Sequence, residues 1–406
     1  MTARRTPAWA FLILVAPFGI SGGYVGVTLA FLLAKAGMPT AAIAGIIAFS
    51  IWPQTWKVLW APIIDTSLTA KAWYGLGVVL TGLSILALSL SPATVKNAPL
   101  LIGLVVMSSL ASTLVSMGTE LFMAYGVEES RKGVVSGWSQ AGNLGGSGIG
   151  GGLGLYLAQH TAGHWVAGAA LAALCIACGA GLFLVDEPDR PSPKPYSAAL
   201  KAVFKDVWAI ARSRVGVLVI LLMLLPIGSG GASGVWAAIA GEWKVGGDTV
   251  ALVNGVLGGL ASLVGAVAAG FICDRMDRKT AYCVFGLALA AVAVVMALAP
   301  RSPIIFVTAT LGYALVLGAC YAAYSATVLE AIGQGAAATK FNFLSSISNV
   351  PVAAMTAADG AFHDRYGASG MLYGEASLAV LAVVGFTIFA RLTRRRRPPV
   401  AASPVR

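Results

Sequence analysis

Long apolar runs separated by short polar stretches dominate this chain. A helix needs about 20 apolar residues to cross the hydrocarbon core of a bilayer, and twelve segments approach or exceed that length. The expected spans are 8–34, 40–64, 72–91, 98–125, 134–158, 163–185, 214–241, 249–272, 280–299, 302–330, 338–360 and 369–391. The pattern therefore predicts an all-α membrane protein with twelve transmembrane helices.

The composition points to lipid as the main partner of the protein surface. Only 11% of the 406 residues are charged, and 58% are hydrophobic, whereas a soluble domain carries about 25% charged residues. The 49 glycines suit helices that pack closely inside a bilayer, where small residues let backbones approach. Nucleic acid is not expected as a partner despite the net charge of +11, because cytoplasmic loops of membrane proteins are basic.

The basic residues predict the orientation of the chain. Of the 27 Lys and Arg residues, 21 fall on the side of the N-terminus and of alternate loops, five fall on the other side, and Lys57 lies inside a span. The positive-inside rule then places both termini in the cytoplasm. Arg4 and Arg5 precede an apolar run that continues to Ala34 without a cleavage site, which indicates an uncleaved first span rather than a signal peptide.

The longest loop divides the spans six and six. It begins with a proline-rich stretch from Asp186 and continues with apolar residues at helical spacing between Leu200 and Ala211, which predicts a linker followed by an amphipathic helix on the membrane surface. We expect an N-terminal six-helix bundle at 1–185, this linker at 186–213, a C-terminal six-helix bundle at 214–393 and a basic tail at 394–406.

The two halves repeat each other at a constant offset. The segment Pro-Phe-Gly begins at Pro17 and the similar segment Pro-Ile-Gly begins at Pro226, 209 residues later. Asp65 and Asp274, at the ends of the second and eighth spans, are also 209 residues apart. The same shift relates Ser136 to Ser345 and Gln140 to Asn349. Matches in one register indicate duplicated, pseudo-symmetric halves, a recurring feature of transporters.

Two charges inside the spans are candidates for function, because a charge in lipid is costly. Lys57 is predicted to hold an anionic group or to pair with an acid, and the alternative is that its long side chain reaches the headgroups. Glu120 in the fourth span is predicted to bind a proton or a cationic group, and the alternative is a structural ion pair with a neighbouring helix.

Two polar stripes predict a shared cavity. Their residues recur on one face of spans five and eleven: Ser136, Gln140, Asn143 and Ser147, and then Asn342, Ser345, Ser346 and Asn349. Such a face must line water, a ligand or another helix, and hydrogen bonding between helices is the alternative. Further lining candidates are Tyr24, Asn254, Tyr321 and Tyr324. We expect spans one, four, five, seven, ten and eleven around the cavity, and the stripe-free spans six, nine and twelve against lipid.

The glycines of span five predict a close helix contact. Gly142, Gly146, Gly150 and Gly154 recur every four residues, which gives a face of small residues for tight packing.

Enzymatic classes find no support in the sequence. It contains no P-loop and no His-Glu-x-x-His motif, and the Gly-x-Ser-x-Gly match at Gly19–Gly23 lies in a membrane span instead of after a strand. Cys175 and Cys178 lie in an apolar run, where small packing residues are favoured over a metal site. We expect no catalytic residue, no metal and no cofactor.

Two loop motifs and one span motif resemble those of a known superfamily. The segment from Gly270 to Lys279, Gly-Phe-Ile-Cys-Asp-Arg-Met-Asp-Arg-Lys, matches the Gly-x-x-x-Asp-Arg-x-x-Arg-Lys loop of the major facilitator superfamily. The segment Lys-Val-Leu-Trp-Ala-Pro-Ile-Ile-Asp, which ends at Asp65, resembles a narrower branch of muropeptide permeases and acetyl-coenzyme A transporters. The segment 338–346 is similar to that branch's Ala-Thr-Gln-x-x-Leu-Leu-Ser-Ser pattern, with Lys340 in place of Gln.

The resemblance implies a secondary transporter. Two six-helix bundles would rock around a midplane site, and a small solute would be imported with protons, the solute being muropeptide-like, siderophore-like or acyl-coenzyme A-like. Asp274, Arg275 and Arg278 would form a cytoplasmic gate with Asp65 as the counterpart, unless these charges only set the orientation. A monomer is expected. The alternative is a membrane receptor or signalling component that binds such a ligand without moving it.

Overall fold

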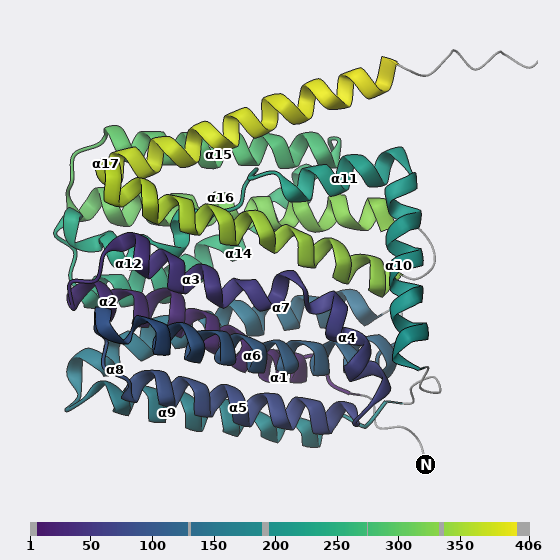
Figure 1. Cartoon of the computed structure of the whole chain (residues 1–406), viewed down its shortest axis with the longest axis horizontal. Coiled ribbons are helices and arrows are strands. Elements are labelled where there is room, and N and C mark those ends of the chain that lie inside the picture. Colours follow the sequence, from purple (N-terminus) through teal and green to yellow (C-terminus); the bar gives the residue numbers. More distant parts are fainter. Residues whose placement is uncertain (1–5, 129–130, 189–194, 274, 333–336, 396–406) are drawn as a thin grey trace, which may run out of the picture.

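A computed structural model describes residues 6–128, 131–188, 195–273, 275–332 and 337–395 of the chain. Every regular element of these residues is a helix. Long helices lie side by side and run in the same general direction across the view, and α10 crosses their ends (Figure 1). We call the end of the molecule that carries α10 the α10 side, and the opposite end the far side.

The first half of the chain forms the lower group of helices in Figure 1. Their bounds are α1 Ala10–Gly23, η1 Tyr24–Leu29, α2 Ala30–Lys35, α3 Thr40–Thr55, α4 Lys57–Thr66, α5 Ala70–Leu90, η2 Val95–Asn97, α6 Ala98–Gly126, α7 Lys132–Gly148, η4 Ile149–Leu153, α8 Gly154–His160, α9 His164–Cys178 and η5 Gly179–Leu184. The helix α10, Tyr196–Arg212, then runs across the ends of both groups and contacts α4, α11 and α17.

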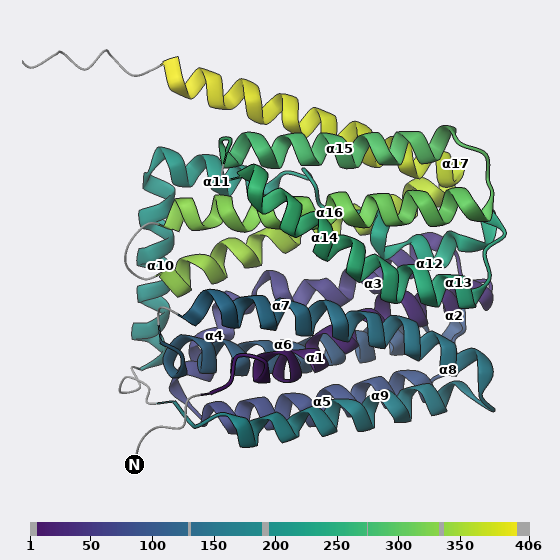
Figure 2. The ribbon, with the colours of Figure 1, turned by 180° about the vertical axis from the view of Figure 1, so that it is seen from behind.

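The second half forms the upper group, which Figure 2 shows from behind. Its elements are α11 Arg214–Leu224, η6 Gly231–Gly234, α12 Trp236–Ile239, η7 Ala240–Trp243, α13 Gly247–Val250, η8 Ala251–Leu257, α14 Gly258–Cys273, α15 Arg278–Leu298, α16 Pro303–Ile332 and α17 Ala337–Arg395. The helix α17 folds back on itself at Gly367, where the backbone leaves helical geometry with φ 70° and ψ −178°.

The seventh expected span is broken in the middle. Its first helix, α11, ends at Leu224, just before Pro226, which has no amide hydrogen to continue a helix. Gly228 and Gly230 follow with φ of 62° and 70°, a left-handed conformation that glycine adopts without strain. The chain then resumes as short helical turns from Gly231, so several backbone groups near the centre of the molecule are free of regular helix bonding.

Fewer helices meet the length and apolarity of a membrane span than the sequence predicts. Among the described residues, eight do so, or nine if α10 and α11, bent by 101°, form one span. The two last expected spans merge into α17, and the segments 40–64 and 214–241 are divided by breaks after Thr55 and Leu224. The segment 134–158 is helical throughout but rich in glycine and serine. Twelve membrane crossings therefore remain a prediction.

The contacts between the two halves are themselves related by the sequence repeat. The α3 helix, from the second expected span, packs along α17, from the eleventh, and η4, from the fifth, packs against η8, from the eighth. The 209-residue shift converts the second span into the eighth and the fifth into the eleventh, so exchanging the halves converts one contact into the other. The interface thus has the pseudo-twofold relation that the repeat predicts.

On the far side, one hydrophobic core joins both halves. It contains Tyr24 and Leu33 from the first half and Trp236, Trp243 and Met371 from the second. These side chains are nearly inaccessible, so the two halves are sealed against each other at this end.

On the α10 side, the apolar side chains form two separate cores. One includes Phe11, Tyr74 and Phe122 of the first half, and the other includes Val219 and Phe386 of the second. The halves meet at this end where α4 contacts α17 and where both contact α10. The molecule is therefore closed by a common core at one end and joined more loosely at the other.

Candidate functional site

A cavity of about 250 Å³ lies between the two halves. It is lined by α1 and η1 and by α7 from the first half, and by η6, α12, η8, α14 and α16 from the second. These elements correspond to expected spans one, five, seven, eight and ten. Spans one, five, seven and ten agree with the prediction, span eight is an addition, and no described residue of spans four and eleven lines this cavity.

Glycines form much of the cavity wall, and small polar side chains supply its chemistry. The polar and aromatic lining residues are Ser147, Ser233, Asn254, Ser262, Thr310, Trp236 and Tyr313. The Asn254 Oδ1 and Thr310 Oγ1 atoms are buried and accept or donate no hydrogen bond within the described part of the chain. Buried polar atoms are almost always hydrogen-bonded, so these two are available to a bound molecule. No charged side chain is among the described residues that line the cavity.

Lys57 and Glu120 pair with each other away from this cavity. The Lys57 Nζ atom lies 3.2 Å from Glu120 Oε1, and Ser116 Oγ donates to the same oxygen over 3.1 Å. The Lys57 side chain is 11% exposed and the Glu120 side chain 38%. For Glu120, the structure thus shows the ion pair between neighbouring helices that the sequence left open as the alternative. For Lys57, it shows the expected pairing with an acid.

The polar stripe of span five only partly faces the cavity. Ser147 lines it, whereas Gln140, two turns closer to the α10 side, is exposed, and Asn143 is half-buried. Gly19 of α1 lies so close to α7 that a Cβ there would be 2.1 Å from the carbonyl oxygen of Asn143. The stripe therefore runs from the cavity towards the more loosely joined end of the molecule.

The polar stripe of span eleven is engaged mostly within α17. Asn349 Nδ2 donates to the carbonyl oxygen of Ser345 over 2.9 Å, and Ser348 Oγ donates to the Tyr324 hydroxyl of α16 over 3.3 Å. Asn342 is half-buried, like Ser345 and Asn349. Ser348 adjoins the stripe but is not one of its predicted members, and the Oγ atom of the stripe residue Ser346 is buried with no hydrogen-bond partner among the described residues. Cavity lining by this stripe therefore stays a prediction.

The remaining tyrosine candidates differ in their surroundings. Tyr24 is 1% exposed and belongs to the core that joins the halves, so its side chain is enclosed by apolar neighbours. Tyr321 of α16 is exposed. Neither side chain lines the 250 Å³ cavity.

The expected cytoplasmic gate is only partly within the described residues. Asp274 and the side chain of Asp65 lie outside them. Arg275 is exposed, and Arg278 Nη1 donates to the carbonyl oxygen of Ala326 in α16 over 3.3 Å. Lys279 forms an ion pair with Glu330, also of α16. Arg278 and Lys279 therefore hold contacts within the second half.

The far side carries polar contacts that cross between the halves, which the sequence analysis did not identify. Asp364 Oδ2 accepts a hydrogen bond over 3.0 Å from the amide of Ala41. Ala41 lies in the first turn of α3, whose preceding residue is Pro39 without a capping side chain, so Asp364 supplies the cap from the other half. His160 of α8 lies 2.8 Å from Asp248 of α13. Both contacts link the two halves at this end.

A third far-side cluster supports Asp364 from within the second half. Glu242 interacts with His363 and with Arg301, and His363 Nδ1 lies 3.5 Å from Asp364 Oδ1. The hydrogen bond from His363, with the charges of His363 and Arg301, lowers the pKa of Glu242. Glu242 is therefore favoured in its ionised form, which holds His363 next to the capping carboxylate.

Two buried acids of α17 were also missed. Asp359 is 0% exposed and Glu375 is 5% exposed, and both carboxyl groups converge on the broken seventh segment at Gly231 and Ala232. Their signal was present in the sequence, because an acid inside or at the end of an expected span is a functional candidate by default. The twelfth span is expected at the lipid-facing periphery, and Glu375 lies on a buried part of it, bonded to Tyr313 of α16.

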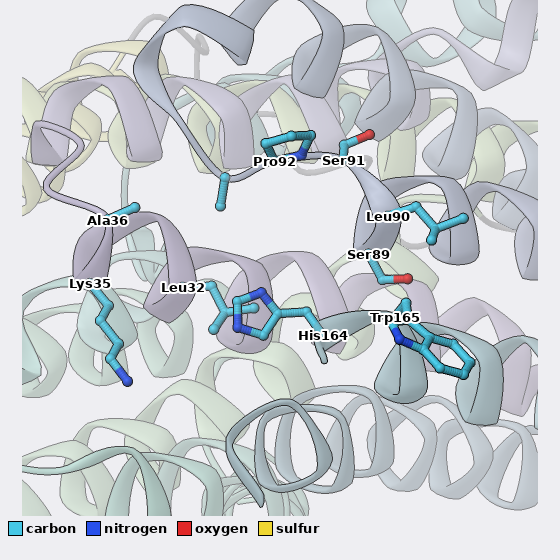
Figure 3. A pocket seen from close by; sticks show the side chains of 10 residues that line it. Leu32, Lys35, Ala36, Ser89, Leu90, Ser91, Pro92, His164 and Trp165 are labelled. Atoms are coloured by element: carbon cyan, nitrogen blue, oxygen red, sulfur yellow. The ribbon is translucent and has the colours of Figure 1, made fainter. Parts of the chain in front are cut away.

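A second recess lies on the far side, at the end of the first half alone. Its volume is about 500 Å³, and its walls are the end of α2, the turn after α5 and the start of α9. The rings of His164 and Trp165 lie across from the Ser91–Pro92 turn (Figure 3). The recess is open and contacts one half only, so it does not have the position of a site that both halves would share.

The glycine face of span five packs as the sequence predicts. A Cβ on Gly142, Gly146 or Gly150 would lie 2.3, 2.3 or 2.1 Å from a backbone oxygen of α1. The helix backbones are therefore in direct contact, and Thr28 Oγ1 adds hydrogen bonds to the carbonyl oxygens of Gly150 and Gly151.

Comparison with known proteins identifies the fold. No protein-family model matches the sequence, and no curated protein sequence matches it significantly. Among solved structures, the nucleoside transporter NupG (D323A mutant) has a TM-score of 0.72 at 11% identity, with 94% of this chain and 98% of that chain covered. The xylose transporter XylE from E. coli, in a partially occluded inward open conformation, has a TM-score of 0.71 at 12% identity, with 98% and 99% covered.

A third structure agrees with these two. A bacterial homolog of the human lysosomal transporter Spinster, inward-facing and unoccupied, has a TM-score of 0.70 at 12% identity, with 98% of this chain and 100% of that chain covered. All three are membrane transporters and not enzymes. The chain has their fold, which is the architecture that a resemblance to the major facilitator superfamily implies. Identities this low establish the fold alone.

Proposed function

We propose that this chain is a secondary transporter that moves a small solute across the membrane by alternating access between its two halves. The observation that carries the proposal is the cavity of about 250 Å³ between the halves, next to an interface that is sealed by a common core at one end only. A binding site at the contact of two repeats, flanked by a broken helix, is the arrangement by which many carriers expose a site to each side in turn.

The orientation follows from the basic residues. With both termini in the cytoplasm of a bacterial inner membrane, the α10 side faces the cytoplasm and the far side faces outward. This orientation fits twelve membrane crossings in two six-helix bundles. The broken and glycine-rich segments would supply the remaining crossings, because irregular backbone is tolerated inside a membrane where other parts of the protein cover it. The conformation is then closed outside and looser inside, and we take a monomer as the working unit.

The chemistry of the cavity favours an uncharged, hydroxyl-bearing part of a solute. Its described lining offers an amide, hydroxyl groups and the rings of Trp236 and Tyr313, but no charge. An acyl-coenzyme A would need cations for its phosphates, so the sugar rings of a muropeptide fit this lining better among the classes that the sequence suggests, with the peptide carboxylates placed outside it. Ligand sites for drug-sized molecules measure about 300–1,000 Å³, so a solute of that size requires the α10 side to open.

Proton-coupled import remains part of the proposal, but Glu120 is a weak carrier for it. Its carboxylate is paired with Lys57 at 3.2 Å, so a coupling role would require this ion pair to break. Uptake that is unchanged in Glu120→Gln would exclude Glu120 as the coupling group.

The test is solute uptake into proteoliposomes. Purified protein would be offered a labelled anhydro-muropeptide, acetyl-coenzyme A and a ferric siderophore, each with protein-free liposomes as the control. Concentrative or exchange-dependent uptake of one of them supports a transporter. Saturable binding without flux for the same compound would instead favour the receptor alternative.

A crosslink tests alternating access directly. His160 and Asp248 lie across the interface on the far side with 2.8 Å between their side-chain atoms, and the five native cysteines are all buried and unpaired. A His160→Cys/Asp248→Cys pair joined by a short bifunctional thiol reagent with a reducible link is expected to lose uptake, with recovery after reduction. The single variants are the matched controls. Uptake that continues at full rate through the crosslinked pair would refute the mechanism.

A further inference from the structure

The two buried acids of α17 meet at the break in the seventh segment. Asp359 and Glu375 lie on the two arms of α17, before and after the kink at Gly367. The Ala232 amide donates to Glu375 Oε1 over 3.3 Å, and the Tyr313 hydroxyl donates to the same oxygen. Asp359 Oδ2 lies so close to Gly231 that a Cβ there would be 2.5 Å from it. We call Asp359 and Glu375 the carboxyl pair.

No positive charge neutralises the carboxyl pair within the described part of the chain. Both oxygens of Asp359 and the Oε2 atom of Glu375 are buried without a hydrogen-bond partner. The helices α3 and α12 contain no charged residue, and the basic residues of α15 lie in its first turn, on the α10 side. Burial of two unpaired carboxylates costs several kcal/mol for each ion, so the pair must take up a positive species.

The other titratable groups near the pair are already engaged. Tyr313 of α16 donates to Glu375, and Cys320 lies further along the same helix. His363 is one helical turn after Asp359, but it interacts with Glu242 and Asp364 on the far side. None of these groups supplies a charge to the pair.

The surrounding donors indicate which species is bound. Glu375 receives hydrogen bonds from an amide and a hydroxyl, which stabilise a carboxylate, whereas Asp359 receives none. A proton on Asp359 would remove its charge and also provide the donor that the free Glu375 oxygen lacks. A metal cation needs oxygen lone pairs around it, but the groups that point at Glu375 are hydrogen-bond donors.

We propose that Asp359 and Glu375 form a proton-binding site, in which the two carboxyl groups share one proton against the broken seventh segment. The proton resides on Asp359, and Glu375 is the carboxylate that faces Tyr313 and Ala232.

This proton site adjoins the wall of the cavity. Tyr313 and Trp236 both line the cavity, and their rings meet edge to face with centroids 5.4 Å apart. When the proton leaves, two like charges face each other, and their repulsion acts on the segment that holds Gly231 and Ala232. Binding and release of the proton therefore change the cavity wall, which makes the site suited to couple protons to solute movement. This coupling role rests on the proposed transport function, whereas the proton site itself does not.

Infrared spectroscopy of the reconstituted protein tests the site without any solute. A protonated carboxyl group has a C=O stretch that ionised carboxylates lack and that shifts in D₂O. At neutral pH we expect this band in the native protein and its loss in Asp359→Asn, a variant of the same shape as the protonated acid. Glu330→Gln, which removes an acid held in an ion pair with Lys279, is the matched control and should keep the band.

Several results would overturn the proposal. The band could be absent from the native protein, it could persist in Asp359→Asn, or sodium chloride could abolish it at constant pH, which would indicate a cation site. If Asp359→Asn does not yield folded protein, Glu375→Gln replaces it. Its amide would donate to Asp359 and favour the ionised form, so an unchanged band there would equally refute a shared proton.

A second measurement tests coupling. In proteoliposomes that take up solute, an inward proton gradient should raise the uptake rate of the native protein. The Asp359→Asn variant should lose this increase while still exchanging solute across the membrane. Acceleration that survives Asp359→Asn would overturn the coupling role. Absence of uptake by the native protein would count against the proposed function, and the infrared band would still decide the proton site.

Discussion

Replacing Gly146 by alanine should separate two helices whose backbones touch. A Cβ on Gly146 would lie 2.3 Å from the carbonyl oxygen of Ala16 in α1. Ordinary van der Waals contact begins at 3.4 Å, so α1 would have to move by about 1 Å. Gly142 and Gly150 hold α1 equally closely one turn before and after, so the helix cannot tilt away at one point only.

The magnitude follows from two opposing effects. Overpacking of this kind costs about 1–3 kcal/mol, while alanine gains up to about 1 kcal/mol over glycine in helix propensity. Gly145→Ala is a matched control, because Gly145 is adjacent in α7 and a Cβ there would meet nothing within 4 Å. Both variants share the propensity gain, so the difference between them measures the cost of the contact alone, about 1–3 kcal/mol.

Thermal unfolding in detergent, followed by tryptophan fluorescence, would measure that difference. Gly146→Ala should melt at a lower temperature than Gly145→Ala, and Gly145→Ala at the native temperature or slightly above. Equal melting temperatures of the two variants would mean that α1 and α7 do not approach each other as described, and the argument from the glycine face would be refuted.

Three further predictions concern the polar contacts. Lys57→Ala should destabilise the protein by about 1 kcal/mol, because Glu120 is half-exposed and solvent partly screens its charge. Adding Glu120→Gln should recover stability in a double-mutant cycle measured by melting curves, and strictly additive losses would argue against the ion pair. Asp364→Ala should remove the cap of α3 and lower the free energy of unfolding by about 0.5–2 kcal/mol. It should also raise the rate at which a maleimide added on the far side labels a Ser262→Cys reporter, and an unchanged rate would show that this contact does not hold the far side closed. Since its partners lower the pKa of Glu242, its contribution to closure is complete above its ordinary pKa of 4.5 and is lost as the pH falls through the lower folded value. Acid slows maleimide labelling in every variant because the thiolate is lost, so the rate is compared with that of Glu242→Gln at the same pH. The ratio of the native rate to the Glu242→Gln rate should rise in acid, and a constant ratio would contradict the role of Glu242.

The carboxyl pair illustrates what the sequence could have provided. Glu375 lies inside an expected span and Asp359 at the end of another, so the cost of charge in lipid was enough to mark both as candidates. The polar stripes instead pointed to Asn349 and Gln140. What the sequence could not indicate is that the two acids meet, because that depends on the fold-back of α17 at Gly367.

The far-side contacts were beyond sequence analysis for a different reason. Pro39 before α3 leaves the first amides of that helix without a local cap, which the sequence does show. The carboxylate that supplies the cap comes from Asp364, 323 residues further along the chain. A pairing across such a distance is set by how the two halves dock, and no local pattern encodes it.

The sequence by itself indicated the helical membrane fold, the repeat of motifs at an offset of 209 residues, the amphipathic helix after the proline-rich linker and the close glycine face of span five. These features follow from apolar length, from residue spacing and from the size of side chains, all of which act locally along the chain. The tertiary structure alone decided that Glu120 is paired, that Tyr24 is enclosed, and that the cavity lies against a broken helix beside two unpaired acids. Those outcomes depend on which polar groups meet across helices, because in a protein of so few charges each buried group takes its chemistry from its partner.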